Sequence, residues 1–256
     1  MSFISGKFGQ FAYFNLQLGG PLWRGKKVLD FGGNQGNMLT DPDSPIEHEH
    51  YWCLDISQSA IAAGRAAFPA AHWLFYDRYN LQFNPAGIVG LDVPDTGQQF
   101  DYILAYSVFT HIGKVEMREL VCSLTRQLAA DGILALTFID PHYVPWPESS
   151  AQTNLAWRLS WAQEDHPAVQ IAGAELLEKA RHASSCTLTI GAELTLACDG
   201  LAEHESPDEL ECHTFYTVEL MREIFPGAMI LPPVNAEMQH CCLISKAAGC
   251  HANFRE

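Results

Sequence analysis

Basic side chains are scarce in this sequence. It contains 15 Lys and Arg residues against 30 Asp and Glu residues, so the formal net charge of the 256-residue chain is −15 at pH 7. A surface of that sign repels phosphate backbones and anionic lipids. We therefore expect neither a nucleic-acid partner nor a membrane partner.

Long apolar runs and CxxC pairs of cysteines are also absent. No run approaches the roughly 18 apolar residues that a transmembrane helix needs. The eight cysteines include no CxxC pair, and the first 20 residues lack a basic stretch followed by an uninterrupted apolar segment. The chain is thus predicted to have no signal peptide and to keep reduced thiols, which favours a cytoplasmic protein.

Apolar residues make up 48% of the chain, which is enough for a full hydrophobic core. From residue 26 strand-like and helix-like segments alternate, which predicts an α/β fold with a doubly wound, mostly parallel sheet. The expected strands are 26–32, 50–56, 72–77, 100–107, 133–140, 228–231 and 240–246.

Three helices are expected between these strands. Ser57 is predicted to cap the first, which ends near Phe68, and Thr217 to cap a helix over 218–225. A third helix is predicted over 115–130, ended by the pair Asp131-Gly132. After the first strand, Pro42 and Pro45 leave room only for a short helix.

The core is predicted to comprise 26–140 and 215–256, separated by an insertion over 141–214. The insertion is about twice as long as a plain crossover requires. It contains two helix-like segments, 154–163 and 174–182, and a hairpin-like segment, 186–198. We interpret it as a helical and hairpin cap over the carboxyl edge of the sheet, where doubly wound sheets bind ligands.

The segment VLDFGGNQGN, residues 28–37, is the most informative part of the chain. Its glycines allow a ligand to lie against the backbone, although a tight turn alone would explain them equally well. Asp30 precedes the glycines, where it would repel a pyrophosphate but attract an ammonium group. Asp55 ends the next strand, where an acid can hold a ribose diol. A ligand with both groups is S-adenosylmethionine.

Four segments in order, VLDFGGNQG, CLDIS, WLFYDRYN and FDYILAYSVFTHI, resemble motifs of the class I S-adenosylmethionine-dependent methyltransferases of small-molecule type. The resemblance covers 26–140 and, more loosely, 215–246. It implies a Rossmann-like seven-stranded sheet of order 3-2-1-4-5-7-6 with strand seven antiparallel. It also implies S-adenosyl-L-methionine as cofactor and S-adenosylhomocysteine as product.

The same resemblance implies a set of cofactor-binding residues. Asp55 would accept from the ribose, Asp77 from the adenine amine, and Asn34 stands where a glycine is commonest but tolerates the left-handed conformation. An N-terminal lid helix within residues 1–25 would add Phe11 and Tyr13. The core positions are Asp30, Gly32, Gly33, Asn34, Gly36, Asp55, Ile56, Tyr76, Asp77, Ala105, Tyr106 and Ser107.

Methyl transfer is an in-line displacement, in which a base helps only if the acceptor carries a proton. His111 is the first candidate base, with a structural histidine at a helix start as the alternative. His142 and Tyr143 lie just beyond the fifth predicted strand and are further catalytic candidates. No metal site is expected, because Tyr106 and Ser107 occupy the position where catechol-type enzymes carry a carboxylate.

The acceptor site is expected to combine residues after the fourth strand with aromatic residues of the insertion. Trp157 and Trp161 share one helix face, either as an acceptor wall or as packing onto the core. The predicted substrate-binding residues are Tyr106, His111, His142, Tyr143, Trp146, Trp157 and Trp161.

These observations predict methyl transfer to O or N of a small, aromatic or heterocyclic metabolite in natural-product biosynthesis. The enzyme would act as a monomer or homodimer. Three alternatives remain open at this point. They are a non-catalytic cofactor-binding scaffold of the same fold, a methyltransferase acting on a peptide or protein, and an NAD-dependent oxidoreductase, which Asp30 disfavours. The role of His48 and His50 also stays open, with a solvated turn favoured.

Overall fold

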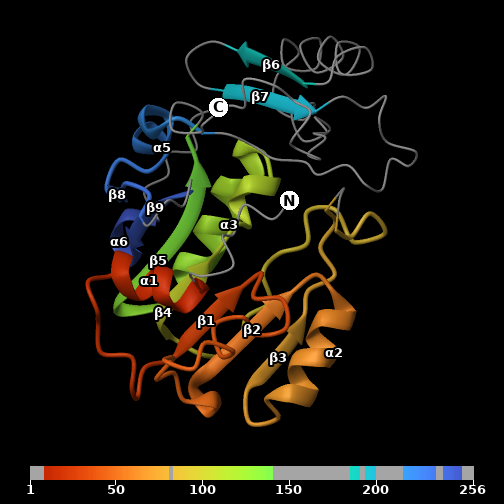
Figure 1. Cartoon of the computed structure of the whole chain (residues 1–256), viewed down its shortest axis with the longest axis vertical. Helices are drawn as coiled ribbons and strands as arrows, with labels where there is room; N and C mark the ends of the chain where they lie inside the picture. Colours follow the sequence, from red (N-terminus) through yellow and green to blue (C-terminus); the bar gives the residue numbers. More distant parts are fainter. Residues whose placement is uncertain are drawn as a thin grey trace.

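The structure is a computed structural model that describes residues 9–80, 83–140, 185–190, 194–199, 216–234 and 239–249. Its centre is a seven-stranded sheet of order β3-β2-β1-β4-β5-β9-β8 (Figure 1). The strands are β1 (Val28–Phe31), β2 (Tyr51–Asp55), β3 (His72–Phe75), β4 (Phe100–Ala105), β5 (Leu128–Ile139), β8 (Met229–Leu231) and β9 (Gln239–Ser245).

The pairing of these strands confirms the predicted order. Strands β1 to β5 pair with one another in parallel, whereas β9 runs antiparallel to both β5 and β8. The parallel strands therefore all end at one edge, which is where Figure 1 shows their arrowheads.

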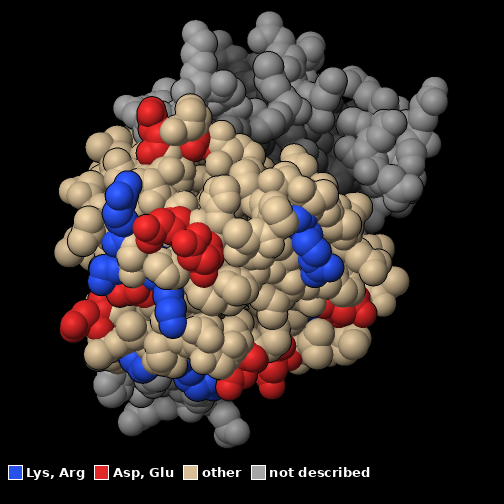
Figure 2. Space-filling model, turned by 90° about the horizontal axis from the view of Figure 1, so that it is seen from below, with Lys and Arg blue, Asp and Glu red and all other residues tan. Residues whose placement is uncertain are grey.

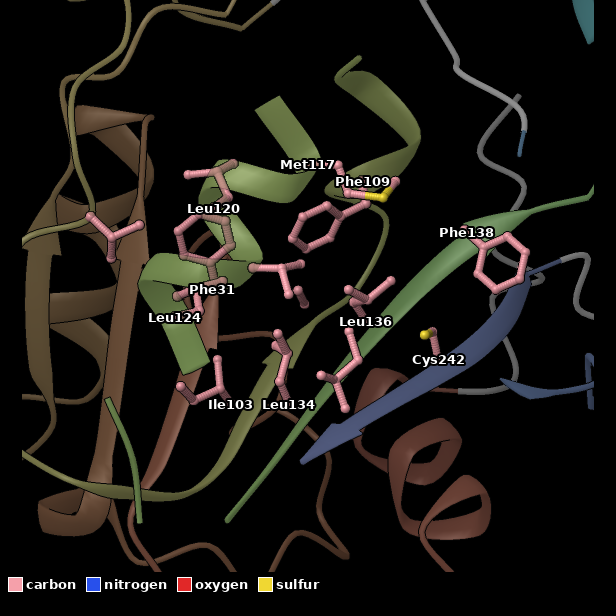
Figure 3. Close-up of a cluster of buried hydrophobic side chains, with 14 of the residues drawn as sticks. Phe31, Ile103, Phe109, Met117, Leu120, Leu124, Leu134, Leu136, Phe138 and Cys242 are labelled. Atoms are coloured by element: carbon pink, nitrogen blue, oxygen red, sulfur yellow. The ribbon is translucent and has the colours of Figure 1, made fainter. Parts of the chain in front are cut away.

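Helices cover both faces of the sheet. They are α1 (Gln10–Gln17), α2 (Gln58–Ala67), α3 (Lys114–Arg126), α5 (Val218–Ile224) and α6 (Lys246–Gly249). Buried side chains of α3 and α5 join one core cluster, and those of α1 and α2 join the other. Figure 3 shows the first cluster, in which Met117, Leu120 and Leu124 of α3 face the sheet residues. The molecule is a three-layer α/β/α structure.

Because successive side chains of a strand point to opposite faces, neighbouring cysteines of β9 lie on opposite faces of the sheet. Cys241 lies in the cluster under α1, and Cys242 in the cluster under α3 and α5. Both side chains are fully buried. Their position confirms that the two thiols pack in the core and do not act as a pair.

The helix caps predicted from the sequence are confirmed. The Ser57 hydroxyl accepts from the backbone N–H of Ala60 at 3.2 Å, and the Thr217 hydroxyl accepts from that of Leu220 at 3.1 Å. The hairpin is also confirmed, since β6 (Ser185–Ile190) pairs antiparallel with β7 (Leu194–Asp199). No described helix is long and apolar enough to cross a membrane.

The predicted end of the third helix is wrong. Helix α3 stops at Arg126, and β5 already begins at Leu128 and runs through Asp131 and Gly132. The pairing with β4 is irregular there, because Leu128 pairs with Phe100 while Ile133 pairs with Tyr102. A Cβ on Gly132 would lie 2.5 Å from the Phe100 carbonyl oxygen, so this residue permits the close approach.

The short helix expected after the first strand is also not found. From Gly32 to Glu47 the chain forms successive turns, followed by the 3-10 helix η1 (His48–His50). Gly33 O accepts from Gly36 N at 2.9 Å, and Gly36 O accepts from Leu39 N at 2.9 Å. Met38 is nevertheless fully buried, so this irregular segment packs as a helix would.

Charged side chains of opposite sign lie close together on the face drawn in Figure 2. Lys and Arg appear there in small groups beside Asp and Glu, with no continuous basic stripe on that face. Elsewhere in the contacts of the described residues, Lys26 and Asp101 form an ion pair at 2.8 Å.

Candidate functional site

A cavity of about 490 Å³ opens at the carboxyl edge of the sheet. Its walls are formed by the ends of β1, β2 and β4, by the segment after β3 and by helix α3. Its lining residues are Gln10, Phe31, Gly32, Asn34, Asn37, Leu54, Asp55, Ile56, Ser57, Tyr76, Arg78, Tyr79, Asn80, Phe83, Tyr106, Ser107, Val108, His111, Ile112, Glu116 and Leu120. This volume is in the range of small-molecule sites.

The glycine turn forms one wall of the cavity. Gly32 has φ of +74°, and a Cβ there would meet Cγ2 of Val108 at 2.3 Å. Asn34 has φ of 53°, which confirms that it takes the left-handed conformation. Gly32 therefore leaves room for Val108, and both residues line the cavity.

Asp30 lies directly beneath this turn. Its side chain is buried, and a Cβ on Gly33 would be 2.5 Å from its Oδ2. Tyr51 of the neighbouring strand donates its hydroxyl to the same oxygen at 2.5 Å. Burial raises the pKa of Asp30 to about 7, the Tyr51 hydrogen bond opposes this, and Asp55 adds to it. The carboxyl supports the turn from below and does not line the cavity.

Asp55, at the end of β2, does line the cavity. Its Oδ2 accepts from the backbone N–H of Asn34 at 2.7 Å, and its Oδ1 from that of Ser57 at 2.7 Å. Burial raises its pKa although both hydrogen bonds favour the charged form. An ionised carboxylate has about four acceptor positions. Backbone N–H groups of Asn34, Ser57 and Ile56 occupy three of them, which leaves acceptor capacity for a hydroxyl group of a ligand.

The chain turns sharply where β4 ends. Ser107, like Asn34, is a non-glycine residue with positive φ, here 56°. Its backbone N–H donates to the hydroxyl of Thr137 on β5 at 2.7 Å. Tyr106 and Ser107 both line the cavity, whereas the preceding Ala105 is fully buried and does not.

His111 lies on the 3-10 helix η2 (Phe109–His111) and lines the cavity. Phe83 packs edge-on against its ring, with centroids 5.0 Å apart. The Asn80 amide donates to the His111 carbonyl oxygen at 3.2 Å and accepts from the Phe83 backbone N–H at 3.0 Å. Asn80 thus joins the segment after β3 to the segment after β4.

A buried arginine that the sequence analysis did not identify also lines the cavity. Arg78 donates to Glu116 on α3 at 2.6 Å and to the carbonyl oxygen of Leu91 at 2.6 Å. Tyr76 donates its hydroxyl to that same carbonyl at 2.5 Å. The only local signal was the position of Arg78 directly after the predicted strand, within the motif WLFYDRYN, since its partners lie 13 and 38 residues away.

The structure brings together eight of the predicted site residues along the cavity: Gly32, Asn34, Asp55, Ile56, Tyr76, Tyr106, Ser107 and His111. Gly33 and Gly36 shape the turn without lining the cavity. Asp77 is not among the lining residues, and its Oδ1 accepts from Asn84 at 3.0 Å.

The placement of α1 does not support a direct contact of Phe11 or Tyr13 with the cofactor. Phe11 packs against Trp23, and Tyr13 donates to the carbonyl oxygen of Gln239 at 2.9 Å. Gln10 is the residue of α1 that lines the cavity. The remaining predicted residues, His142, Tyr143, Trp146, Trp157 and Trp161, lie outside the described residues.

His48 and His50 lie in the 3-10 turn before β2. His50 pairs with Glu47 at 3.1 Å, and the His48 ring packs edge-on against Phe68. Among the described residues no group of three His, Cys, Asp or Glu side chains could hold a metal ion.

Comparison with known proteins identifies the domain. Residues 29–134 match the family model of a methyltransferase domain. No curated protein sequence matches the chain.

Three solved structures illustrate the similarity in fold. A TehB-like S-adenosylmethionine-dependent methyltransferase from Corynebacterium glutamicum is 20% identical over 53% of this chain, with a TM-score of 0.39. PKMT2 from Rickettsia typhi is 21% identical over 48% of this chain, with a TM-score of 0.37. CalS10, an amino pentose methyltransferase from Micromonospora echinaspora, is 15% identical over 85% of this chain and 82% of its own, with a TM-score of 0.48. The chain spans 64% of the first structure and 23% of the second.

Proposed function

Residues 29–134 carry a class I S-adenosylmethionine-dependent methyltransferase domain, and we propose that this chain methylates O or N of a small, aromatic or heterocyclic metabolite. One observation supports this most directly. A single cavity combines the glycine turn, the Asp55 carboxylate and the segment from Tyr106 to His111.

The residues of one half of the cavity fit the cofactor. Asp55 lines the cavity and keeps acceptor capacity for a ribose hydroxyl, and Ile56 and Tyr76 offer apolar surface for the adenine ring. The turn at Gly32 and the Tyr106–Ser107 segment would hold the methionine end. The bound cofactor supplies an electrophilic methyl group on a sulfonium centre.

The residues of the other half would orient the acceptor. His111 lines the cavity beyond Ser107 and would remove a proton from the acceptor O or N. Phe83, in edge-on contact with His111, adds an aromatic surface at the same place. Positioning of the two reactants, with water excluded, would supply most of the acceleration.

Composition supports the wider setting that we propose. Eight cysteines without a CxxC pair suit reduced thiols in the cytoplasm, and the net charge of −15 disfavours nucleic acid and anionic membranes as partners. We propose a monomer or homodimer with a role in natural-product biosynthesis.

Isothermal titration with S-adenosylhomocysteine and, separately, with NAD tests the proposal. We expect micromolar binding of S-adenosylhomocysteine and no binding of NAD. Methyl acceptors can then be screened with S-adenosylmethionine labelled in its methyl group. Labelling of peptides but not of small aromatic acceptors would contradict the substrate class, and binding of neither S-adenosylhomocysteine nor NAD would contradict the cofactor site.

A further inference from the structure

Ser107 has a backbone conformation that a non-glycine residue rarely adopts. Its φ of 56° lies in the left-handed region, where the Cβ atom is crowded. Such a conformation persists only when surrounding contacts hold it. Ser107 also lines the cavity, directly after β4. Whatever holds Ser107 therefore determines the shape of this wall.

The contact that holds the Ser107 backbone comes from β5. The Ser107 N–H donates to Oγ1 of Thr137 at 2.7 Å. The Thr137 hydroxyl in turn donates to Oε1 of Gln239 on β9, and both side chains are buried. A hydroxyl has a single proton, so the donation to Gln239 turns a lone pair of Thr137 towards the Ser107 N–H. Gln239 thereby orients Thr137.

Gln239 is itself held by the N-terminal helix, since Tyr13 donates to its backbone carbonyl at 2.9 Å. The chain of hydrogen bonds thus runs from α1 through β9 and β5 to the cavity wall. Its three members, Tyr13, Gln239 and Thr137, lie outside the cavity lining.

We infer that Thr137 is a positioning residue for the cofactor, which fixes Ser107 so that the methionine half of S-adenosylmethionine can bind beside it. This inference rests on the proposed function. Without the Thr137 hydroxyl the part-buried Ser107 N–H loses this acceptor, and the segment spends less time in the binding conformation. Apparent affinity falls in proportion to that population.

Two variants of Thr137 distinguish the effect of losing its hydroxyl from the effect of changing its packing. Thr137→Val has nearly the same shape but no hydroxyl, whereas Thr137→Ser keeps the hydroxyl and loses the methyl group. Thr125→Val is the matched control, because Thr125 is also fully buried and its hydroxyl donates to Val121 O within α3 at 2.8 Å. Each protein is titrated with S-adenosylhomocysteine and with methylthioadenosine, which lacks the amino-acid group.

We expect Thr137→Val to raise the Kd for S-adenosylhomocysteine by about tenfold or more, as for loss of a hydrogen bond to a buried group. Its Kd for methylthioadenosine should change by less than about threefold, because the adenosine half lies at Asp55. Thr137→Ser should bind S-adenosylhomocysteine within about threefold of the wild type, and Thr125→Val should match the wild type.

Equal binding by Thr137→Val and the wild type would overturn the inference, as would an equal loss for both ligands. If Thr137→Val does not fold, Gln239→Met removes the acceptor for the Thr137 hydroxyl, and the same pattern is expected. Failure of the wild type to bind S-adenosylhomocysteine would instead refute the proposed function.

Discussion

Among single residues, Asp30 couples stability to pH most strongly. Burial raises its pKa from 3.8 to about 7, so between these values the folded protein keeps a proton that the unfolded chain has released. The free energy of unfolding therefore falls as pH rises through this window. At about 1.4 kcal/mol per pKa unit, the loss is about 4 kcal/mol.

We predict that Asp30→Asn removes this loss, so that its stability falls less than that of the wild type between about pH 4 and pH 7. Urea unfolding at both pH values measures the difference.

Asp101 serves as a comparison, because its pKa is shifted in the opposite direction to that of Asp30. Burial opposes the shift, but hydrogen bonds from Lys26 and the Lys27 backbone lower the pKa of Asp101. The stabilisation by Asp101 is present at neutral pH and lost as pH falls. Parallel pH curves for the wild type and Asp30→Asn would contradict the prediction.

His111 is the residue for which a proton-transfer role can be tested directly. We predict that His111→Ala lowers turnover by about tenfold or more, as for loss of a general base. The assay needs a labelled methyl donor and an acceptor from the screen described above. His72, an exposed histidine on β3, provides the matched variant His72→Ala. Unchanged turnover and an unchanged pH profile for His111→Ala would make His111 structural.

A substitution of Asp55 tests the cofactor-binding half of the cavity. We predict that Asp55→Ala weakens binding of S-adenosylhomocysteine by about tenfold or more, since it removes the acceptors for the ribose and the link to Asn34. Isothermal titration measures the effect. Undiminished affinity would refute the assignment of the ribose site to this strand end.

At the scale of elements, α2 contains a glycine that its position in a helix does not explain. Glycine costs about 1 kcal/mol relative to alanine inside a helix. A Cβ on Gly64, however, would lie 2.2 Å from Cζ3 of Trp73 on β3. That ring is held in place because its indole N–H donates to the Phe68 carbonyl at 3.1 Å.

We therefore predict that Gly64→Ala destabilises the protein by about 1–3 kcal/mol, as overpacking does, although helix propensity alone predicts a gain. Chemical denaturation measures the sign. Ala63, exposed on the same helix, gives the control Ala63→Gly, which should cost about 1 kcal/mol by propensity alone. Stabilisation by Gly64→Ala would show that Trp73 can move away.

The boundary between α3 and β5 shows where local patterns are insufficient. Leu128 continues the apolar stripe of the helix, so the sequence pattern extended the helix to residue 130. In the structure, Phe100 N donates to Gln127 O at 2.9 Å and Leu128 pairs with Phe100. A strand forms where a partner strand supplies hydrogen bonds, and that partner lies some 28 residues earlier in the chain.

At the scale of the whole molecule, the N-terminal helix is joined to the C-terminal strands. Tyr13 donates to Gln239 O and Gln17 donates to Pro232 O, each at 2.9 Å. Figure 1 shows α1 beside this side of the sheet. These contacts connect positions more than 200 residues apart in the sequence.

We predict that Tyr13→Phe lowers the free energy of unfolding by about 1 kcal/mol, the usual net value of one hydrogen bond. It should also weaken binding of S-adenosylhomocysteine, because Gln239 orients Thr137. Denaturation and titration of the same variant measure both effects. Tyr102→Phe, on a half-exposed tyrosine of β4, is the control. A loss of stability without any change in affinity for S-adenosylhomocysteine would show that α1 does not influence the cofactor site.

Whereas the order of the sheet followed from the family resemblance, the sequence alone determined the α/β class, the two capped helices and the position of the glycine turn, Asp55 and His111 near strand ends. These features depend on local periodicity, on capping side chains and on strand ends, all of which are written in short segments. Only the tertiary structure decided the roles of Arg78, Thr137 and Gln10, and the burial of Phe11 and Tyr13. Their contacts join segments far apart in the chain, and no local pattern encodes which distant groups will meet.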